Sequence, residues 1–318
     1  RYGLPEKIGG WEQILESTLI GAAREQFIWA DLDGRKYAAI GTNKVLVIYY
    51  EGAFFDITPL GTALTSCTFD TVNTSATVTV NKAAHGLEPG DIFLFSSVTP
   101  PTGAGYVASD FETNPFQVVT VPGSDTFTIT MASAAGTTVN GSGSATVTPY
   151  IKPGSLTSTF GFGWGTGLWG GGQQVFSTLN GALLDDTAGT GGVGTSITLA
   201  STSGFPSTGT IVDPASWSLD NFGQQLIATI KNGQSFSWNP INSNSNALNT
   251  RATIISNAPT KSVMSLVSDR DRHLIMLGTE TTIGDTGTQD KLFIRFSDQE
   301  NISDYTPTSV NTAGTFRL

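Results

Sequence analysis

Short apolar runs separated by turn residues make up most of the chain. Residues 44–50 and 126–130 are rich in β-branched and aromatic side chains, which favour strands. The Asn-Gly pair at 232–233 separates two apolar runs in the pattern of a β-hairpin. Helical periodicity is weak and confined to residues 11–30, where Gly21 interrupts it and an aromatic run favours a strand. The pattern therefore predicts an all-β protein.

Two segments near opposite ends of the chain share one order of features. Residues 27–59 run as an aromatic strand, an Asp-x-Asp turn, an apolar strand ending in Gly-Thr, a further strand and an Asp-x-Thr-Pro turn. Residues 265–307 repeat this order, and residues 217–240 form a shorter copy. Each copy predicts three or four antiparallel strands within about 40 to 50 residues, the unit of a β-propeller blade. Propeller blades are favoured over a plain β-meander, because the turn residues repeat from copy to copy as well as the number of strands.

Residues 63–150 differ in amino-acid composition from these copies, because Thr, Ser, Gly and Val dominate and charged residues are few. A tight turn that contains His85 leads into one of several strand-like runs, and the Asn-Gly pair at 140–141 predicts another turn. The predicted strands cover 77–80, 92–95, 116–119 and 126–130. These features predict a small β-barrel or sandwich inserted between blades, at the surface where insertions are tolerated.

The copies and the module together predict three regions. A first propeller blade region is expected over residues 1–62, the inserted β module over 63–150, and further blades over 151–318 with a short insertion at about 184–214. The chain begins with Arg1 rather than Met, so we expect it to be cut from a longer polypeptide.

Composition and charge narrow the class of protein. Only 13% of the 318 residues are charged and 37 are glycine, which excludes a coiled coil, a helical bundle and a highly charged disordered tail. The net charge of −10 disfavours a protein that holds nucleic acid through phosphate contacts. No run approaches the roughly 18 consecutive apolar residues of a membrane helix, so no membrane segment is expected.

The reactive side chains are few and scattered. The single cysteine, Cys67, excludes an intrachain disulfide and a thiolate metal cluster. His85 and His273 lie far apart, and no Gly-x-Ser-x-Gly segment supports a catalytic triad. We therefore expect both imidazoles to hydrogen-bond within turns.

Acidic pairs occur in three turns, at 31/33, 185/186 and 269/271. Closely spaced carboxylates bind calcium in some proteins, but the twelve-residue calcium-loop pattern is absent here. Asp31 and Asp269 occupy equivalent places in the repeats, so capping of turn amides is the preferred explanation. We expect no metal, no cofactor and no catalytic residue. An acid/base pair formed by distant carboxylates stays open on the sequence alone.

The most unusual segment is the glycine-aromatic run at 160–172, in which glycine alternates with Phe, Trp, Thr and Leu. It lacks the pattern of a phosphate-binding loop. Trp164 and Trp169 have the chemistry to stack on sugars or bases, but glycine also lets backbones approach while indoles bury area. The favoured hypothesis for these two residues is a packing or interface role, in a close-packed loop or a subunit contact, and glycan contact is the alternative.

Six stretches of the sequence resemble a family of phage virion proteins. They are RYGLPEKIGGW at 1–11, WADLDG at 29–34, IGT at 40–42, DNFGQQLIA at 220–228, FSDQEN at 296–301 and TAG at 312–314. The family comprises the tail stabilisation or tail nozzle (tail tube) proteins of short-tailed double-stranded DNA bacteriophages. The resemblance covers the blade-like segments at both ends and leaves 63–150 and 184–214 outside it.

The resemblance implies a structural protein of the virion, located in the phage tail. It implies β-propeller blades and a ring-forming homo-oligomer, usually a hexamer, that extends the DNA-ejection channel below the portal. The implied partners are further copies of the chain, the adaptor or portal and other tail proteins, and double-stranded DNA passes through without specific binding. The acidic charge suits such a conduit, because it repels phosphates.

Two further hypotheses belong to other classes. One is a tail-borne or secreted β-propeller protein that binds or degrades glycans with Asp and Glu side chains and the loop of Trp164 and Trp169. A panel of glycans separates it from the structural hypothesis. The other is a cell-surface adhesion module, which a monomer without rings favours.

Overall fold

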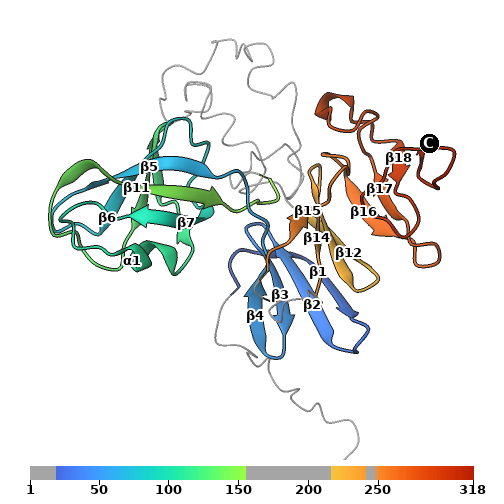
Figure 1. Ribbon diagram of the computed structural model, residues 1–318, viewed down its shortest axis with the longest axis horizontal. Helices are drawn as coiled ribbons and strands as arrows, with labels where there is room; N and C mark the ends of the chain where they lie inside the picture. Colours follow the sequence, from blue (N-terminus) through green and yellow to red (C-terminus); the bar gives the residue numbers. More distant parts are fainter. Residues whose placement is uncertain (1–18, 155–215, 241–247, 249) are drawn as a thin grey trace, which may run out of the picture. The chain divides into compact units, whose positions relative to one another are not determined.

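The fold is all-β over the residues that the computed structural model describes, which are 19–154, 216–240, 248 and 250–318. Three sheets have four strands each and one has seven, and every pairing between strands is antiparallel (Figure 1). The α-helix α1 (Ala108–Glu112) has only five residues. The predicted fold class is therefore confirmed. The limits of the three predicted regions stay predictions, and the insertion at 184–214 lies outside the described residues.

Each four-stranded sheet is a meander in which strands pair in chain order. Blade 1 consists of β1 (Ala23–Ala30), β2 (Lys36–Thr42), β3 (Leu46–Tyr50) and β4 (Ala53–Asp56). Blade 2 consists of β12 (Trp217–Phe222), β13 (Gln225–Ile230), β14 (Ser235–Trp238) and β15 (Thr253–Ile254). Blade 3 consists of β16 (Met264–Val267), β17 (Leu274–Leu277), β18 (Phe293–Phe296) and β19 (Gly314–Arg317). The first strand of blade 2, β12, contacts the first strands β1 and β16 of the other two blades, as expected for propeller-like blades.

Aromatic residues fill the interface between blades 1 and 2. Trp29 and Tyr37 lie in one buried cluster with Trp217 and Trp238. The Trp217 indole donates its N–H to the carbonyl oxygen of Thr42 at 2.8 Å, so the buried ring keeps a polar partner. The blades are thus held together by apolar area and by hydrogen bonds between their ends.

The interface between blades 2 and 3 is more polar. The Thr229 and Ser265 hydroxyls lie 2.7 Å apart, and the Ser218 hydroxyl donates to the Ser265 carbonyl at 2.8 Å. Phe222 and Ile227 of blade 2 share a buried cluster with Leu274 and Met276 of blade 3. One face of blade 3 therefore packs on blade 2.

The two long copies differ at their closing turns. The turn at 56–59 follows the fourth strand of blade 1, whereas the turn at 304–307 precedes the fourth strand of blade 3. In both turns the aspartate side chain accepts the N–H of the threonine two residues on, Asp56 from Thr58 and Asp304 from Thr306. The repeated sequence therefore encodes the same local Asx turn at two places in the blade order.

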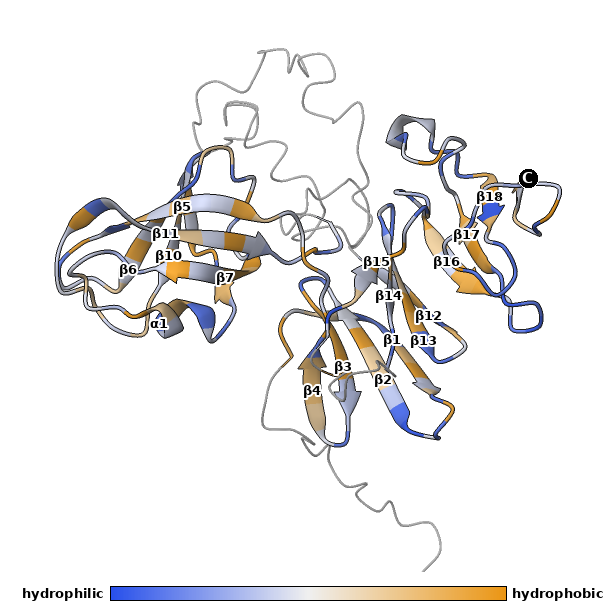
Figure 2. Ribbon diagram, in the orientation of Figure 1, coloured by the Kyte–Doolittle hydropathy of each residue, from blue (hydrophilic) through white to orange (hydrophobic). Residues whose placement is uncertain are grey.

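The seven-stranded sheet has the strand order β8-β7-β11-β5-β6-β10-β9 and is curled. Its core is rich in phenylalanine, with Phe69, Phe93, Phe111 and Phe127 almost fully buried. Figure 2 shows the apolar residues along the strands and hydrophilic ones in many of the turns. The strands are β5 (Leu64–Thr71), β6 (Thr77–Asn81), β7 (Ile92–Thr99), β8 (Phe116–Gln117), β9 (Thr120–Gly123), β10 (Thr126–Thr130) and β11 (Val139–Pro149).

The two Asn-Gly predictions within the described residues had opposite outcomes. The pair at 232–233 does turn the chain between β13 and β14, with Asn232 at φ +58°. The prediction of a turn at 140–141 was wrong, because this pair lies within strand β11. Gly141 and Gly143 have positive φ there, and the register against β5 shifts beside them. The same backbone freedom serves a β-bulge instead of a turn.

Candidate functional site

The residues singled out for interface or glycan contact, Trp164 and Trp169, lie outside the described residues, as does the acidic pair at 185/186. Both hypotheses for the two tryptophans therefore stay predictions. The remaining candidates are His85, His273, Cys67 and the turns with acidic pairs, and each can be placed.

The two histidines are bound to backbone, as the sequence predicted. His85 is buried, and its Nδ1 accepts the N–H of Leu87 at 3.0 Å. This leaves the hydrogen on Nε2, which lies 3.3 Å from the carbonyl oxygen of Gly123. His273 Nδ1 lies 2.8 Å from the carbonyl oxygen of Ser297. Both imidazoles fasten turns to neighbouring strands, which is a structural role.

The acidic turn of blade 1 is held by Asp31, in agreement with its predicted role as a cap. One carboxylate oxygen accepts the N–H groups of Asp33 and Arg35 at 3.0 and 2.9 Å. The other accepts from the Arg35 guanidinium at 2.7 Å and from the Tyr37 hydroxyl at 3.2 Å. Asp269 in the matching turn of blade 3 is exposed. That turn is closed by a backbone hydrogen bond from the N–H of Ser268 to the carbonyl oxygen of His273. The repeat thus preserves the turn but not the cap.

Over residues 19–154, 216–240, 248 and 250–318, His, Cys, Asp and Glu do not gather in groups of three suited to a metal ion. Within those same ranges, no helix has the length and hydropathy to cross a membrane. Cys67 is buried, and burial raises the pKa of its thiol.

A polar cluster joins three segments that are distant in sequence. Asp56, at the end of β4, accepts from the Tyr150 hydroxyl at 2.5 Å and from the Arg251 guanidinium at 3.0 Å. Arg251 also donates to the Thr58 carbonyl at 2.8 Å and lies over the Tyr150 ring at 4.5 Å. Burial, and then the bond to Asp56, raise the pKa of the Tyr150 phenol. Because every charge in the cluster is paired, it links blade 1, the end of β11 and blade 2 rather than presenting a reactive group.

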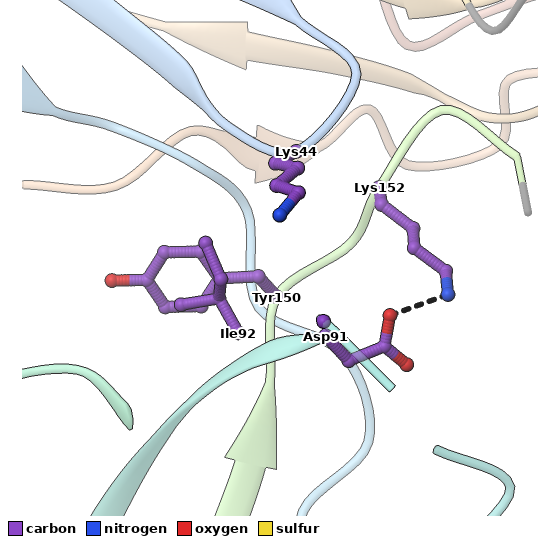
Figure 3. Close-up of a pocket in the computed structure, with 6 residues that line it drawn as sticks. Lys44, Asp91, Ile92, Tyr150 and Lys152 are labelled. Atoms are coloured by element: carbon purple, nitrogen blue, oxygen red, sulfur yellow. Dashed lines mark hydrogen bonds and ion pairs between the residues drawn. The ribbon is translucent and has the colours of Figure 1, made fainter. Parts of the chain in front are cut away.

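A small hollow lies next to this cluster. Its volume is about 10 Å³, about the space of one water molecule and far below the 300 Å³ or more of ordinary ligand pockets. Figure 3 shows Lys44, Ile92 and Tyr150 at its wall and the Lys152 ammonium paired with Asp91. A second carboxylate, that of Glu88, lies 2.9 Å from the same ammonium. The hollow is therefore too small for a sugar ring, and Lys152 is already neutralised.

A buried glutamate in blade 3 is also fully used by the fold. Glu280 accepts the N–H of Gly284 at 2.7 Å and hydrogen bonds from the backbone and hydroxyl of Thr260. Arg295, on the same face of the sheet as Ser265, donates to the carbonyls of Tyr305 and Thr281. These groups hold the long loop between β17 and β18, which is a stabilising role.

The feature with most functional content is the outer face of blade 3, meaning the face opposite the residues that pack on blade 2. Two rows of paired residues cross it, Met264–Leu277–Ile294–Phe316 and Leu266–Ile275–Phe296–Gly314. None of these residues is polar, and Phe316 is 60% exposed. Sequence reasoning missed this face. Its signal is the unbroken apolar run of β17, typical of strands buried on both sides.

Comparisons with known proteins leave the family open. No protein-family model matches the chain, and no curated protein matches it. Among solved structures, the phage phi92 endosialidase aligns with a TM-score of 0.25 and 15% sequence identity. The alignment covers 93% of this chain and 37% of that chain, so the chain spans little more than a third of the length of that protein. At this TM-score the alignment carries no argument about function, which is therefore argued from the residues and the blades.

Proposed function

We propose that this chain is a structural protein of a phage virion, a ring-forming component of the tail nozzle or tail tube with no catalytic activity. The observation that carries the proposal is the series of three four-stranded blades whose first strands follow one another in space. Three of the stretches that resemble the tail nozzle family, at 29–34, 220–228 and 296–301, lie in or beside strands of these blades, whereas the stretch at 1–11 lies outside the described residues. In the virion the ring would contact the adaptor or portal and other tail proteins and extend the DNA-ejection channel.

The use of polar groups in the described residues supports a structural role. His85, His273 and Asp31 are bound to turns, and the Asp56 and Glu280 carboxylates are saturated by neighbours. A hydrolase acting on glycans needs two carboxylates free to meet the scissile bond. The polar groups named here spend their hydrogen bonds on turns and blade contacts, as expected for a scaffold.

The test of the proposal is the assembly state of the purified chain. Mass photometry and negative-stain class averages are expected to show closed rings that all contain the same number of copies. Six copies are expected, because the resembling family usually forms hexamers. A population that stays monomeric throughout the micromolar range would contradict the ring and favour an adhesion module.

A glycan panel tests the competing function. The structural proposal predicts neither binding nor cleavage of bacterial polysaccharides by the assembled protein. Specific glycan binding that is lost in Trp169→Ala, while Trp217→Phe retains it, would overturn a purely structural role. Trp217 is a suitable control because its indole is buried between blades 1 and 2.

A further inference from the structure

We propose that the Asn140–Gly141 pair in β11 is a site of spontaneous modification, at which the asparagine cyclises to a succinimide and then opens to aspartate or isoaspartate. The chain has three Asn-Gly pairs, at 140–141, 180–181 and 232–233. The first and the last lie within the described residues. Their surroundings differ in the features that this reaction needs, and they favour the pair in β11.

The reaction joins the backbone nitrogen of Gly141 to the side-chain carbonyl carbon of Asn140. The Gly141 N–H gives up its proton, the bond from this nitrogen to Cγ of Asn140 forms, and the bond from Cγ to Nδ2 breaks. The proton passes to the departing nitrogen, which leaves as ammonia. Water then opens the ring at either carbonyl group. The net change replaces an amide with a carboxyl group and uses only water, which fits the thermal lability of asparagine.

A carboxylate lies next to the atom that must lose its proton. Asp70 of β5 accepts the N–H of Gly141 at 2.6 Å. The register of β11 with β5 produces this contact, because residues 140 and 141 lie together opposite the single residue Asp70. The same oxygen of Asp70 accepts from Nδ2 of Asn81 at 2.8 Å, which fixes its position. A general base within hydrogen-bond distance of the proton that it removes is therefore in place.

The surroundings of the pair leave room for the ring. Asn140 and Gly141 are both exposed. A Cβ atom at Gly141 would meet no atom within 4 Å apart from its chain neighbours. The Asn140 side chain makes no hydrogen bond to the residues that the structure describes. Its carbonyl group is therefore free to turn toward the Gly141 nitrogen.

The pair at 232–233 lacks each of these features. The N–H of Gly233 donates to the carbonyl oxygen of Ile230 at 2.8 Å, and a carbonyl oxygen is too weak a base to remove the proton. A Cβ atom at Gly233 would lie 2.8 Å from Cγ2 of Ile230, so the attacking nitrogen is crowded. The side-chain oxygen of Asn232 accepts from Gln289 at 3.3 Å. The tertiary structure thus separates two pairs with the same local sequence.

The modification changes an interior strand of the seven-stranded sheet. β11 lies between β5 and β7. Either product adds a negative charge beside Asp70, and isoaspartate also adds one carbon to the main chain. The register is already shifted at this point, so the bulge can accommodate the longer chain, whereas the like charges weaken the pairing with β5. Modified molecules therefore accumulate with the age of the protein.

The first test compares the two described pairs in the full chain at neutral pH and physiological temperature. Peptide mapping by mass spectrometry follows each conversion, which adds about 1 Da to its peptide. In the folded protein, Asn140 is expected to convert at least tenfold faster than Asn232. In denaturant the two are expected to convert at similar rates, because glycine follows both. The pair at 180–181 lies outside the described residues and enters neither comparison.

Asp70→Asn tests the role of the base. An amide oxygen at this position still accepts the Gly141 N–H but cannot take its proton, so conversion of Asn140 is expected to slow by tenfold or more. Asp125→Asn is the matched control, because Asp125 holds a turn of the same module by accepting the N–H of Ala84 at 2.9 Å.

Three results would overturn the inference. They are equal rates at Asn140 and Asn232 in the folded protein, a difference between them that persists in denaturant, and a rate at Asn140 that Asp70→Asn leaves unchanged. If circular dichroism shows that Asp70→Asn does not fold, the comparison of folded and denatured wild type decides the question alone.

Discussion

At the scale of single residues, Gly41 is required by its neighbour rather than by its backbone angles. A Cβ atom at this position would lie 2.4 Å from Cδ1 of the buried Trp217 indole. We expect Gly41→Ala to displace the indole and to lower the free energy of unfolding by about 1 to 3 kcal/mol. Denaturant unfolding followed by tryptophan fluorescence measures this. Gly123→Ala is the control, because the nearest atom would be 3.7 Å away, and an equal loss there would contradict the explanation.

Asp31 makes the stability of blade 1 depend on acid pH. Burial raises the pKa of its carboxyl, but hydrogen bonds from Arg35 and Tyr37 outweigh burial and hold it below its ordinary value. The stabilisation is complete above the unfolded pKa of about 4 and is lost as the pH falls through the folded pKa. We expect Asp31→Asn to be less stable than wild type at pH 7, with a difference that shrinks below about pH 4. A difference in unfolding free energy that stays constant down to pH 2 would contradict this.

At the scale of elements, local sequence predicted the strands but not their partners. The run at 126–130 forms β10 with the predicted bounds, because β-branched and aromatic residues favour strands in any sheet. The Asn-Gly pair at 140–141 has the same chemistry as the pair at 232–233, and only the pairing of β11 with β5 decides for a bulge. The contact of Arg251 with Asp56 spans 195 residues, so no short pattern encodes it. The apolar sequence of β17 is typical of a strand covered on both faces. Only its register with β16 and β18 shows which residues lie on the face opposite blade 2.

The cluster of Asp56, Tyr150 and Arg251 is expected to lock the elements that meet there. Replacing Arg251 with Met removes its bonds to all its partners and leaves Asp56 with fewer donors. We predict a loss of about 1 to 3 kcal/mol in unfolding free energy, together with faster proteolysis near residues 57–63 and 150–154. Arg270→Met is the matched control, because that side chain is 92% exposed. Equal effects of the two substitutions would show that the cluster contributes no more than a surface charge.

At the scale of the whole molecule, the acidic net charge determines whether the protein binds DNA. The net charge is −10, and only 13% of the residues are charged. Lysine and arginine residues are therefore too few to build an extensive basic surface. Phosphate contacts by Lys and Arg give nucleic-acid binding a steep dependence on salt. A channel wall that DNA passes benefits from the absence of such contacts.

We therefore predict that the assembled chain does not bind double-stranded DNA, even at low ionic strength. There the Debye length reaches roughly 30 Å, so weak electrostatic attraction is strongest. Fluorescence anisotropy of a labelled duplex, titrated with assembled wild-type protein, measures this. A variant in which exposed Glu25, Glu51 and Asp271 are changed to Lys provides the comparison, since it raises the net charge from −10 to −4, six units for three reversals. Weak, salt-sensitive binding by that variant and none by wild type would show that acidity keeps the surface clear of DNA. Tight binding by wild type that weakens with added salt would instead reveal a concentrated basic surface, and the proposed conduit would be wrong.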